Sequence, residues 1–335
     1  MDVLDWLLEE DADNPGVRYF ALTNLVELPA DSPEVTAARQ ALMDHGPVPA
    51  ILAAQEEEGF WVKPGGGYAP KYRGTVWSVI YLAQLGADPV DARVRAGGAY
   101  VLANSRASNG VFTVTGAPSG SIHCLNGNLG RALQDLDFGA DARLQQALEL
   151  MARLVVGEDV ALGASQGAAL RYYASGTCGP GFCCAANNKL PCAWGAVKVL
   201  RALARIPEAQ RQPVVQLALE ESVEFLLRVD PVTADYPAGY SDKPSSSWFK
   251  FGFPTFYVTD VLQVAEALAE AGHGDDPRLA ATYDFILSKR DKAGCWKMDY
   301  SYAGKTWSDI ERRGQPSKWV TLRAMQLLKR AGIEA

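Results

Sequence analysis

The chain has 335 residues, of which 48% are hydrophobic and 21% are charged. This composition excludes a disordered chain, because enough apolar surface is available to offset the entropy lost on folding. The formal net charge is −7 and the basic residues are scattered, so we expect no nucleic-acid partner. No apolar run approaches the ~18 residues that a membrane span needs, and the acidic start is unlike a signal peptide. We therefore expect a cytoplasmic protein.

Helical periodicity dominates the chain from its first residues. Short helices are predicted to start at Asp2, Asn14, Ser32, Val48 and Asp91. Longer helices, in which apolar residues recur every three or four positions, are predicted over 75–85, 125–136, 141–155, 193–204, 214–227, 258–271, 276–287 and 318–328. Glycine followed by aspartate or proline separates many of them, as expected for a helix end and a new start. The sequence therefore predicts an all-α protein.

A short motif recurs at the ends of three predicted helices. Segment 55–61 reads Gln-x3-Gly-x-Trp, segment 290–296 repeats it with arginine for glutamine, and segment 106–112 repeats it more loosely with phenylalanine at the end. A long polar side chain can cap the helix, glycine permits a sharp reversal, and the aromatic ring can pack over the turn. We expect these segments to link successive helical hairpins.

The motif resembles the QW-type repeat of the squalene-hopene cyclase and protein prenyltransferase superfamily, and segments 249–257 and 316–324 look like an uncharacterised prokaryotic branch of it. The resemblance implies an alpha-alpha toroid, in which six inner helices are ringed by six outer ones. We expect one domain over 1–335, with 1–45 as a helical extension packing on the barrel and 176–192 as a cysteine-rich loop. An open α-solenoid is the alternative, but closure is favoured because the motif recurs near both ends.

The acids and metal ligands of the superfamily are not matched here. The Asp-rich motif with which class II cyclases protonate their substrates is absent, and so is the zinc-binding pattern of protein prenyltransferases. Asp260 and Asp299 remain as candidate acids for a cofactor-free cyclisation, which requires a carboxyl group deep in the cavity with a pKa raised by desolvation.

Cysteines form the second candidate site. Cys178, Cys183, Cys184 and Cys192 fall within fifteen residues, and Cys124 follows His123 at a predicted helix start. Thiolate and imidazole ligands converging from a glycine- and proline-rich loop favour zinc, bound either in a closed structural site or in an open catalytic one. A redox or disulfide pair and buried core cysteines are the alternatives. We also expect the helix start to lower the thiol pKa of Cys124 or Cys192.

Aromatic residues indicate what the toroid encloses. We predict that five of them, at or near the starts of inner helices, line an apolar cavity that accepts an isoprenoid or a similarly hydrophobic molecule: Trp77, Trp248, Phe253, Tyr257 and Trp319.

Two functions follow from these sites. The first is a transferase or cyclase that uses zinc at the barrel mouth and no nucleotide cofactor, with His123 as a ligand or acid-base group and Asp260 as an orienting carboxylate. The second is a non-catalytic toroid that binds a hydrophobic ligand or a partner, in which the metal is purely structural. An open metal position facing the cavity would distinguish the first from the second.

Overall fold

The computed structural model describes residues 2–158 and 178–333. These residues contain thirteen α-helices and no extended strand. The helices are α1 (Val3–Leu8), α2 (Pro15–Phe20), α3 (Pro33–Asp44), α4 (Pro47–Ala53), α5 (Thr75–Leu85), α6 (Ala92–Asn104), α7 (His123–Asp135), α8 (Ala142–Val156), α9 (Ala193–Ala204), α10 (Pro213–Leu227), α11 (Val261–Glu270), α12 (Ala280–Ser288) and α13 (Lys318–Arg330). None of the helices in these two ranges combines the length and the hydrophobicity of a membrane-spanning segment.

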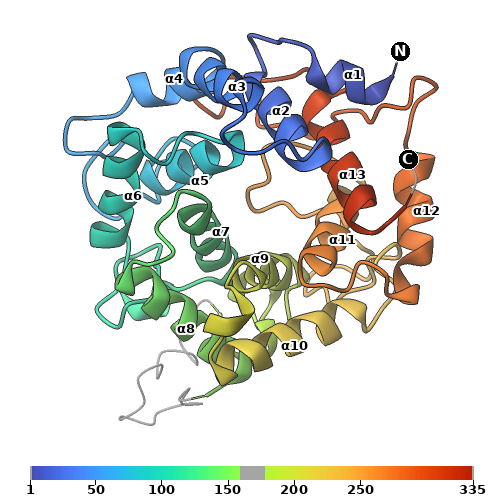
Figure 1. The fold of residues 1–335 in the computed structure, drawn as a ribbon. Helices are drawn as coiled ribbons and strands as arrows, with labels where there is room; N and C mark the ends of the chain where they lie inside the picture. The colour runs from blue at the N-terminus through green and yellow to red at the C-terminus, as the bar shows by residue number, and fades with distance from the viewer. Residues whose placement is uncertain (1, 159–177, 334–335) are drawn as a thin grey trace.

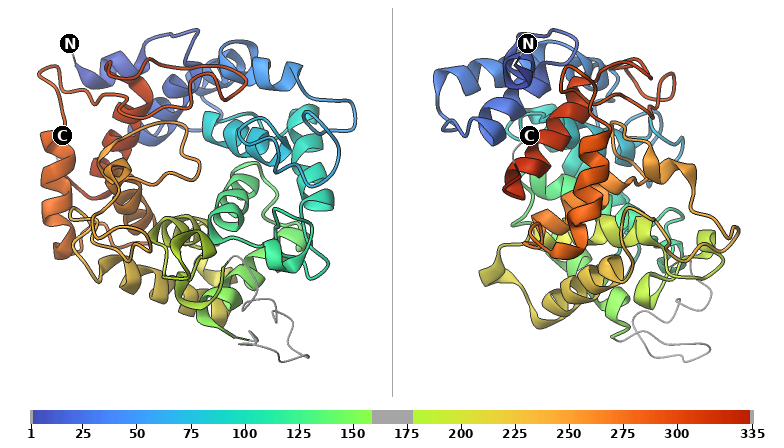
Figure 2. Two further views of the ribbon diagram at one scale, coloured as in Figure 1. Left: turned by 180° about the vertical axis from the view of Figure 1, so that it is seen from behind. Right: turned by 90° about the vertical axis from the view of Figure 1, so that its right-hand side faces the viewer.

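The helices form a closed double ring, as predicted. Figure 1 shows α5, α7, α9, α11 and α13 around a central space, with α6, α8, α10 and α12 outside them, and the view from behind in Figure 2 shows the same ring. The sixth inner position is taken by α2 and the π-helical turn η1 (Ala21–Leu25) that continues it. The inner helices α5, α7 and α9 are buried on nearly all sides, because outer helices cover one face and the ring interior covers the other.

Contacts between the last helix and the first residues close the ring. The indole N–H of Trp319 in α13 donates to Oδ1 of Asn14 at 3.0 Å, in the residue before α2. Near the other end of α13, Lys329 Nζ lies 2.9 Å from Glu27 Oε1. Trp319 is 1% exposed, so this junction is part of the core and the α-solenoid alternative is wrong.

The three motif segments fold into equivalent reversals. In two of them the Trp indole N–H donates to a carbonyl ten residues earlier at 2.7 Å, from Trp61 to Ile51 and from Trp296 to Ile286. The backbone N–H of each tryptophan also donates to a threonine in the next inner helix. At Phe112 the corresponding backbone donation goes to Asn126 Oδ1 in α7. Each reversal is thus fixed to the inner helix that follows it.

The residues before α11 enter the ring instead of passing over it. Residues 251–257, called here the inserted segment, lie inside the central space (Figure 1). Polar side chains of three inner helices hold its backbone: Gln84 accepts from Thr255 N at 2.7 Å, Asn128 donates to Phe256 O at 3.1 Å, and Arg323 donates to Gly252 O at 2.6 Å. These bonds satisfy backbone groups that would otherwise be buried without partners.

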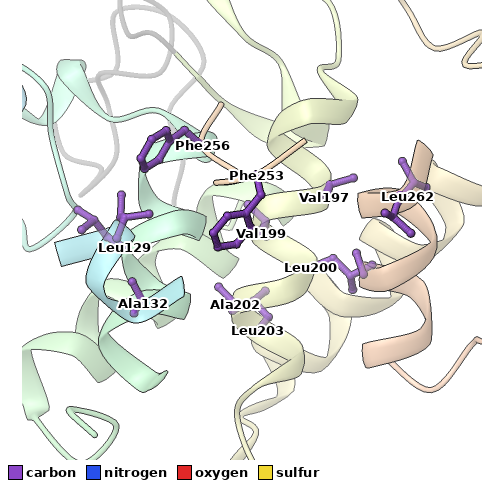
Figure 3. Close-up of a cluster of buried hydrophobic side chains, with 14 of the residues drawn as sticks. Leu129, Ala132, Val197, Val199, Leu200, Ala202, Leu203, Phe253, Phe256 and Leu262 are labelled. Atoms are coloured by element: carbon purple, nitrogen blue, oxygen red, sulfur yellow. The ribbon is translucent and has the colours of Figure 1, made fainter. Parts of the chain in front are cut away.

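Apolar side chains pack the inserted segment against the ring. Figure 3 shows Phe253 and Phe256 among side chains of α7, α9 and α11. Helices α7 and α9 approach each other closely beneath it at Gly127, where an added Cβ would lie 2.3 Å from the Lys198 carbonyl carbon. A glycine is therefore required at that crossing. The close approach also fixes the position of the Lys198 backbone relative to α7.

Candidate functional site

A cavity of about 550 Å³ occupies the part of the ring that the inserted segment leaves free. It is lined by residues from the middle and C-terminal parts of the inner helices, from Ile80 in α5 round to Arg330 in α13, by Trp319 near the start of α13, and by Tyr19 and Phe20 of α2. Phe253 and Thr255 of the inserted segment form part of its wall. The N-terminal helices are therefore part of the cavity and of the ring.

The lining of this cavity is strongly charged. Of the described residues that line it, seven are basic and three are acidic. The basic residues are Arg39, Arg131, Lys198, Arg201, Arg205, Arg323 and Arg330, and the acidic ones are Asp135, Glu266 and Glu270. The prediction of an apolar cavity is therefore wrong: apolar side chains form only part of its wall.

Carboxylates shared between arginines bind the inner helices together. Glu270 of α11 lies 2.6 Å from Arg131 of α7, 3.0 Å from Arg201 of α9 and 3.5 Å from Arg330 of α13. Burial alone would raise the pKa of Glu270, but the positive charges of Arg131 and Arg201 outweigh it and hold that pKa well below its usual range. The carboxylate of Glu270 is therefore ionised, and it is shared by three arginines.

A second shared pair lies deeper in the ring. Arg323 of α13 donates twice to Glu266 of α11, at 2.8 Å each, in the bidentate geometry that suits a guanidinium and a carboxylate. Both side chains are 9% exposed. Because Arg323 also donates to the inserted segment, this pair connects the charged cavity to the segment that closes it.

Lys198 differs from the arginines around it. It is 3% exposed and lines the cavity, and its Nζ donates to the side-chain oxygen of Gln263. Within the described ranges, no carboxylate lies within ion-pairing distance of this ammonium. Burial, together with the positive charge of Arg201, lowers its pKa from 10.5 to about 7.

The structure separates the five predicted cavity aromatics. Phe253 and Trp319 line the cavity and stack with 4.2 Å between their ring centroids. Trp77 lies instead in an aromatic cluster with Tyr257, the last residue of the inserted segment, and their rings are 4.9 Å apart. Trp248 packs on Tyr236 at 5.3 Å. Trp77, Tyr257 and Trp248 are therefore not among the residues that line the cavity.

The predicted thiol cluster forms in part. Cys192, the N-cap of α9, lies close enough to Cys124 at the start of α7 and to Cys184 of the loop for both of these thiols to affect its pKa. Cys178 points elsewhere, and its thiol donates to Ser121 O at 3.1 Å. Cys183 joins the loop through the pairing of its backbone with Pro191. Residues 178–192 therefore do meet the start of α7, whereas the rest of the predicted loop, 176–177, lies outside the described residues.

Protonated thiols are expected at this cluster. The hydrogen bond with Cys124, followed by partial burial, raises the pKa of Cys192 to about 12 despite an opposing bond from Cys184. The hydrogen bond with Cys192 and burial also raise the pKa of Cys184, and burial raises that of Cys178 to about 12. The expected lowering by a helix start is therefore wrong for Cys192, because neighbouring thiols and burial outweigh the helix dipole.

His123 is buried between the loop and α9. Its Nε2 pairs with Gly179 O at 2.9 Å, and its buried Nδ1 has no hydrogen-bond partner among residues 2–158 and 178–333. Burial lowers its pKa to about 4, so the ring is neutral at pH 7. In the part of the chain that the structure describes, no three His, Cys, Asp or Glu side chains are arranged to hold a metal ion. Zinc at the thiol cluster thus stays a prediction.

Asp260 has a structural position. Its carboxylate caps α11 by accepting from Gln263 N at 2.7 Å, and it lies 3.5 Å from Arg323. Burial raises its pKa, as a cyclisation acid requires, yet the side chain is not among those that line the cavity. Asp299 pairs with Lys289 at 2.8 Å, also away from the cavity. Neither carboxyl group faces the space in which a substrate would bind.

Sequence analysis missed the charged residues of the cavity. They recur at three- to seven-residue intervals on helices predicted to be buried, and the set is Arg131 and Asp135, Lys198, Arg201 and Arg205, Glu266 and Glu270, and Arg323 and Arg330. Such spacing places the charges of each helix on one face. Charges aligned on a face of an inner helix indicate a polar ring interior, and that signal was available.

Comparisons with known proteins add a distant similarity. No protein-family model matches the chain, and no curated protein matches it. A crystal structure of a protein from Actinoplanes matches 98% of this chain with 97% of its own, at 13% identity and a TM-score of 0.45. A type II terpene cyclase from Scytonema in complex with merosterolic acid A matches 88% of this chain with 96% of its own, at 13% identity and a TM-score of 0.29. The toroidal fold itself rests on the helix arrangement described above.

Proposed function

We propose that the central cavity binds a small molecule in which a carboxylate or phosphate group adjoins an apolar portion of the isoprenoid kind. The observation that carries this proposal is the lining of seven basic and three acidic described residues, in a chain of formal net charge −7. A cleft whose walls are mostly protein focuses such a charge excess on whatever enters it. An anion is the complementary ligand.

The ends of the inner helices offset part of this excess. Five of them end at the cavity, at Gly86, Asp135, Arg205, Glu270 and Arg330. Each carries about half a negative elementary charge at its C-terminus, which adds to roughly two or three. The side chains contribute four more positive than negative charges when Lys198 is protonated, seven against three, and three more when it is neutral. A positive balance therefore remains.

The apolar part of the lining favours a ligand with a hydrophobic portion. The stacked rings of Phe253 and Trp319 present an aromatic surface next to Arg323, and Ile80 and Leu322 extend it. Polar groups that fix the orientation of a ligand beside an apolar wall are typical of sites that bind small molecules. An isoprenoid with a charged head group has both features.

Binding of farnesyl diphosphate and of uncharged farnesol, measured by calorimetry, tests the proposal. We expect the diphosphate to bind at least about tenfold more tightly, since charge-assisted hydrogen bonds to arginine need the anion. Arg39 lines the cavity and donates to Tyr19 Oη at 2.9 Å, so Arg39→Gln removes a cation without leaving a buried carboxylate. This variant should bind the diphosphate about 3- to 10-fold more weakly.

Arg313, which is exposed and outside the cavity, provides the matched control. Arg313→Gln should leave the affinity unchanged. Equal binding of the diphosphate and the alcohol, or equal effects of the two substitutions, would contradict the proposal.

Zinc-dependent transfer or cyclisation at the same toroid is a second proposal, and the contact of Cys192 with Cys124 and Cys184 favours it. Metal analysis of protein purified without a metal-affinity tag tests it, because a stoichiometric tetrahedral site retains zinc tightly. About one zinc per chain is the expected result. Less than ~0.2 equivalents, with all six cysteines titrating as free thiols, would exclude it and leave the anion site untouched.

A further inference from the structure

Among the residues that the structure describes, the amine of Lys198 has no ion-pair partner, although it lies in a cavity where almost every other cation has one. Five of the six arginines in the lining form ion pairs with carboxylates. Lys198 Nζ donates to the neutral Gln263 amide, which lies in α11 at the N-terminal side of Glu266. A buried lysine without a carboxylate is costly as an ammonium, so its retention calls for another use.

Positive charges on two helices oppose protonation of this amine. Arg201 lies one turn further along α9, Arg323 belongs to α13, and the positive charge of each acts on Lys198. Asp260 of α11 and Cys124 of α7 act in the opposite direction, more weakly than burial does. The resulting pKa of about 7 leaves a substantial fraction of the side chain as a neutral amine at neutral pH. A neutral, desolvated lysine beside another cation is the nucleophile that carbonyl chemistry uses.

We propose that Lys198 forms a reversible imine with the aldehyde or ketone group of an anionic molecule bound in the central cavity. This inference rests on the proposed function, because the neighbouring arginines would hold the anion while the amine meets the carbonyl carbon. Arg323 and Arg201 are the nearest anion ligands, since their charges act on Lys198 and both line the cavity.

The step needs no oxidant and no cofactor. The nitrogen lone pair of neutral Lys198 forms a bond to the carbonyl carbon, and the C=O π electrons move to oxygen, which takes up the proton lost from nitrogen. The hydroxyl group of this carbinolamine then leaves as water, with a proton taken from the solvent, as the C=N bond forms. The product is a protonated imine, and it becomes the neutral imine by returning a proton to the solvent. Overall, one amine and one carbonyl group give one imine and one water, and hydrolysis reverses the sequence. Gln263 Oε1 accepts a hydrogen bond from Nζ and so orients the amine.

Reductive trapping with phenylpyruvate tests the inference. This probe is a 2-oxo acid with an aromatic ring, and sodium cyanoborohydride reduces any imine it forms to a stable amine. Peptide mass spectrometry then measures the modification of each lysine at pH 7. We expect Lys198 to be modified at least about tenfold faster than the exposed Lys63, because amines with pKa values near the working pH react most readily. Phenyllactate, which lacks the carbonyl group, should slow the reaction by competition.

Two variants sharpen the result. Lys198→Arg keeps the positive charge and removes the nucleophilic amine, so no product should form at position 198. Arg39→Gln leaves the amine and weakens the anion site, so the rate at Lys198 should fall about 3- to 10-fold at subsaturating phenylpyruvate. The comparison of Lys198 with Lys63 is made within the wild-type protein, and it stands even where a variant does not fold.

Each outcome is decisive. Modification of Lys198 at or below the rate of Lys63, in protein that phenylpyruvate and phenyllactate both stabilise against heat, overturns the imine and leaves the anion site in place. Fast modification that neither phenyllactate nor Arg39→Gln slows shows a reactive lysine without a bound anion, and overturns both proposals. Slow modification with no stabilisation by either acid also overturns both.

Discussion

The two ends of the ring interior differ in the kind of side chain that they contain and in how completely these side chains fill the space. At the starts of the inner helices, aromatic rings of Trp77, Phe256 and Tyr257 fill the space, with centroids about 5 Å apart. At the ends of the same helices, charged side chains surround an open cavity of about 550 Å³. The inserted segment belongs to both regions, because Phe256 and Tyr257 are part of the aromatic end and Phe253 and Thr255 line the cavity. A toroid of this kind can therefore stabilise itself at one end and leave the other end for a ligand.

The comparison also shows how the charged end is tolerated. Its carboxylates are each shared by two or three arginines, and the bidentate pair of Arg323 and Glu266 connects two helices. A buried pair of this kind adds little stability relative to apolar residues, whereas removing one partner is strongly destabilising. We expect substitutions at the charged end to act through uncompensated charge, and those at the aromatic end through lost packing.

Replacement of Arg323 by methionine should have the largest effect. It removes the cation next to buried Asp260 and the bidentate partner of Glu266, which keeps only Arg201 at 3.6 Å, and it removes a donor to Gly252 O. We expect a loss of about 3 to 5 kcal/mol in the free energy of unfolding, measured by urea denaturation. Arg313→Met, at an exposed position, should cost less than about 0.5 kcal/mol. A loss below about 1 kcal/mol for Arg323→Met would show that the carboxylates are not effectively buried.

Replacement of Trp77 by leucine tests the aromatic end. The ring is fully buried among Phe256, Tyr257 and Tyr72, and its N–H donates to Tyr68 O at 2.7 Å. Lost packing should lower the free energy of unfolding by about 3 kcal/mol. Because no charge is involved, we expect the loss to be the same in 0.05 M and 0.5 M salt, whereas the anion affinity of the folded variant should be unchanged. A tenfold loss of farnesyl diphosphate binding would show that the two ends are coupled.

Sequence analysis predicted the aromatic end less well than the helices. Helix periodicity placed the bounds of 75–85 and 193–204 where the structure has them, because apolar spacing and flanking glycine and proline are local signals. Asp91, Asp141 and Ser317 cap helices for the same reason. The entry of residues 251–257 into the ring was not predictable from spacing, since it depends on donors and acceptors from α5, α7 and α13.

The same limit explains the site. Sequence analysis identified His123 and Cys124 near the later cysteines, and the structure brings Cys124, Cys184 and Cys192 together. It did not predict that Cys178 and His123 turn to backbone oxygens of Ser121 and Gly179, because those bonds require the loop conformation. The spacing of the charged residues along the inner helices indicates a charged lining. The resemblance to a superfamily with hydrophobic cavities implied an aromatic lining instead.

Lys198 allows the charged end to be probed by pH. Its pKa falls from 10.5 in the unfolded chain to about 7 in the folded one, so between these values the unfolded state binds more protons. Stability should therefore rise with pH in this window, by about 2 to 3 kcal/mol between pH 7 and pH 9. Urea denaturation at the two pH values should show this gain in the wild type but not in Lys198→Met. The same gain in both proteins would mean that Lys198 is not the titrating group.

His123 provides the corresponding test beside the aromatic end, with the smallest expected effect. Burial lowers its pKa from 6.5 to about 4, so the folded state resists protonation and the unfolded state does not. The stability contributed above pH 6.5 is lost as the pH falls, and between pH 7 and pH 5 the loss should be about 2 kcal/mol. His123→Gln retains a donor for Gly179 O but cannot titrate, so denaturation curves of this variant should lack that loss. An equal loss of stability in the variant would assign the acid sensitivity to other groups. If the wild type loses no stability between pH 7 and pH 5, solvent or a bound metal reaches Nδ1, for which the described residues provide no partner.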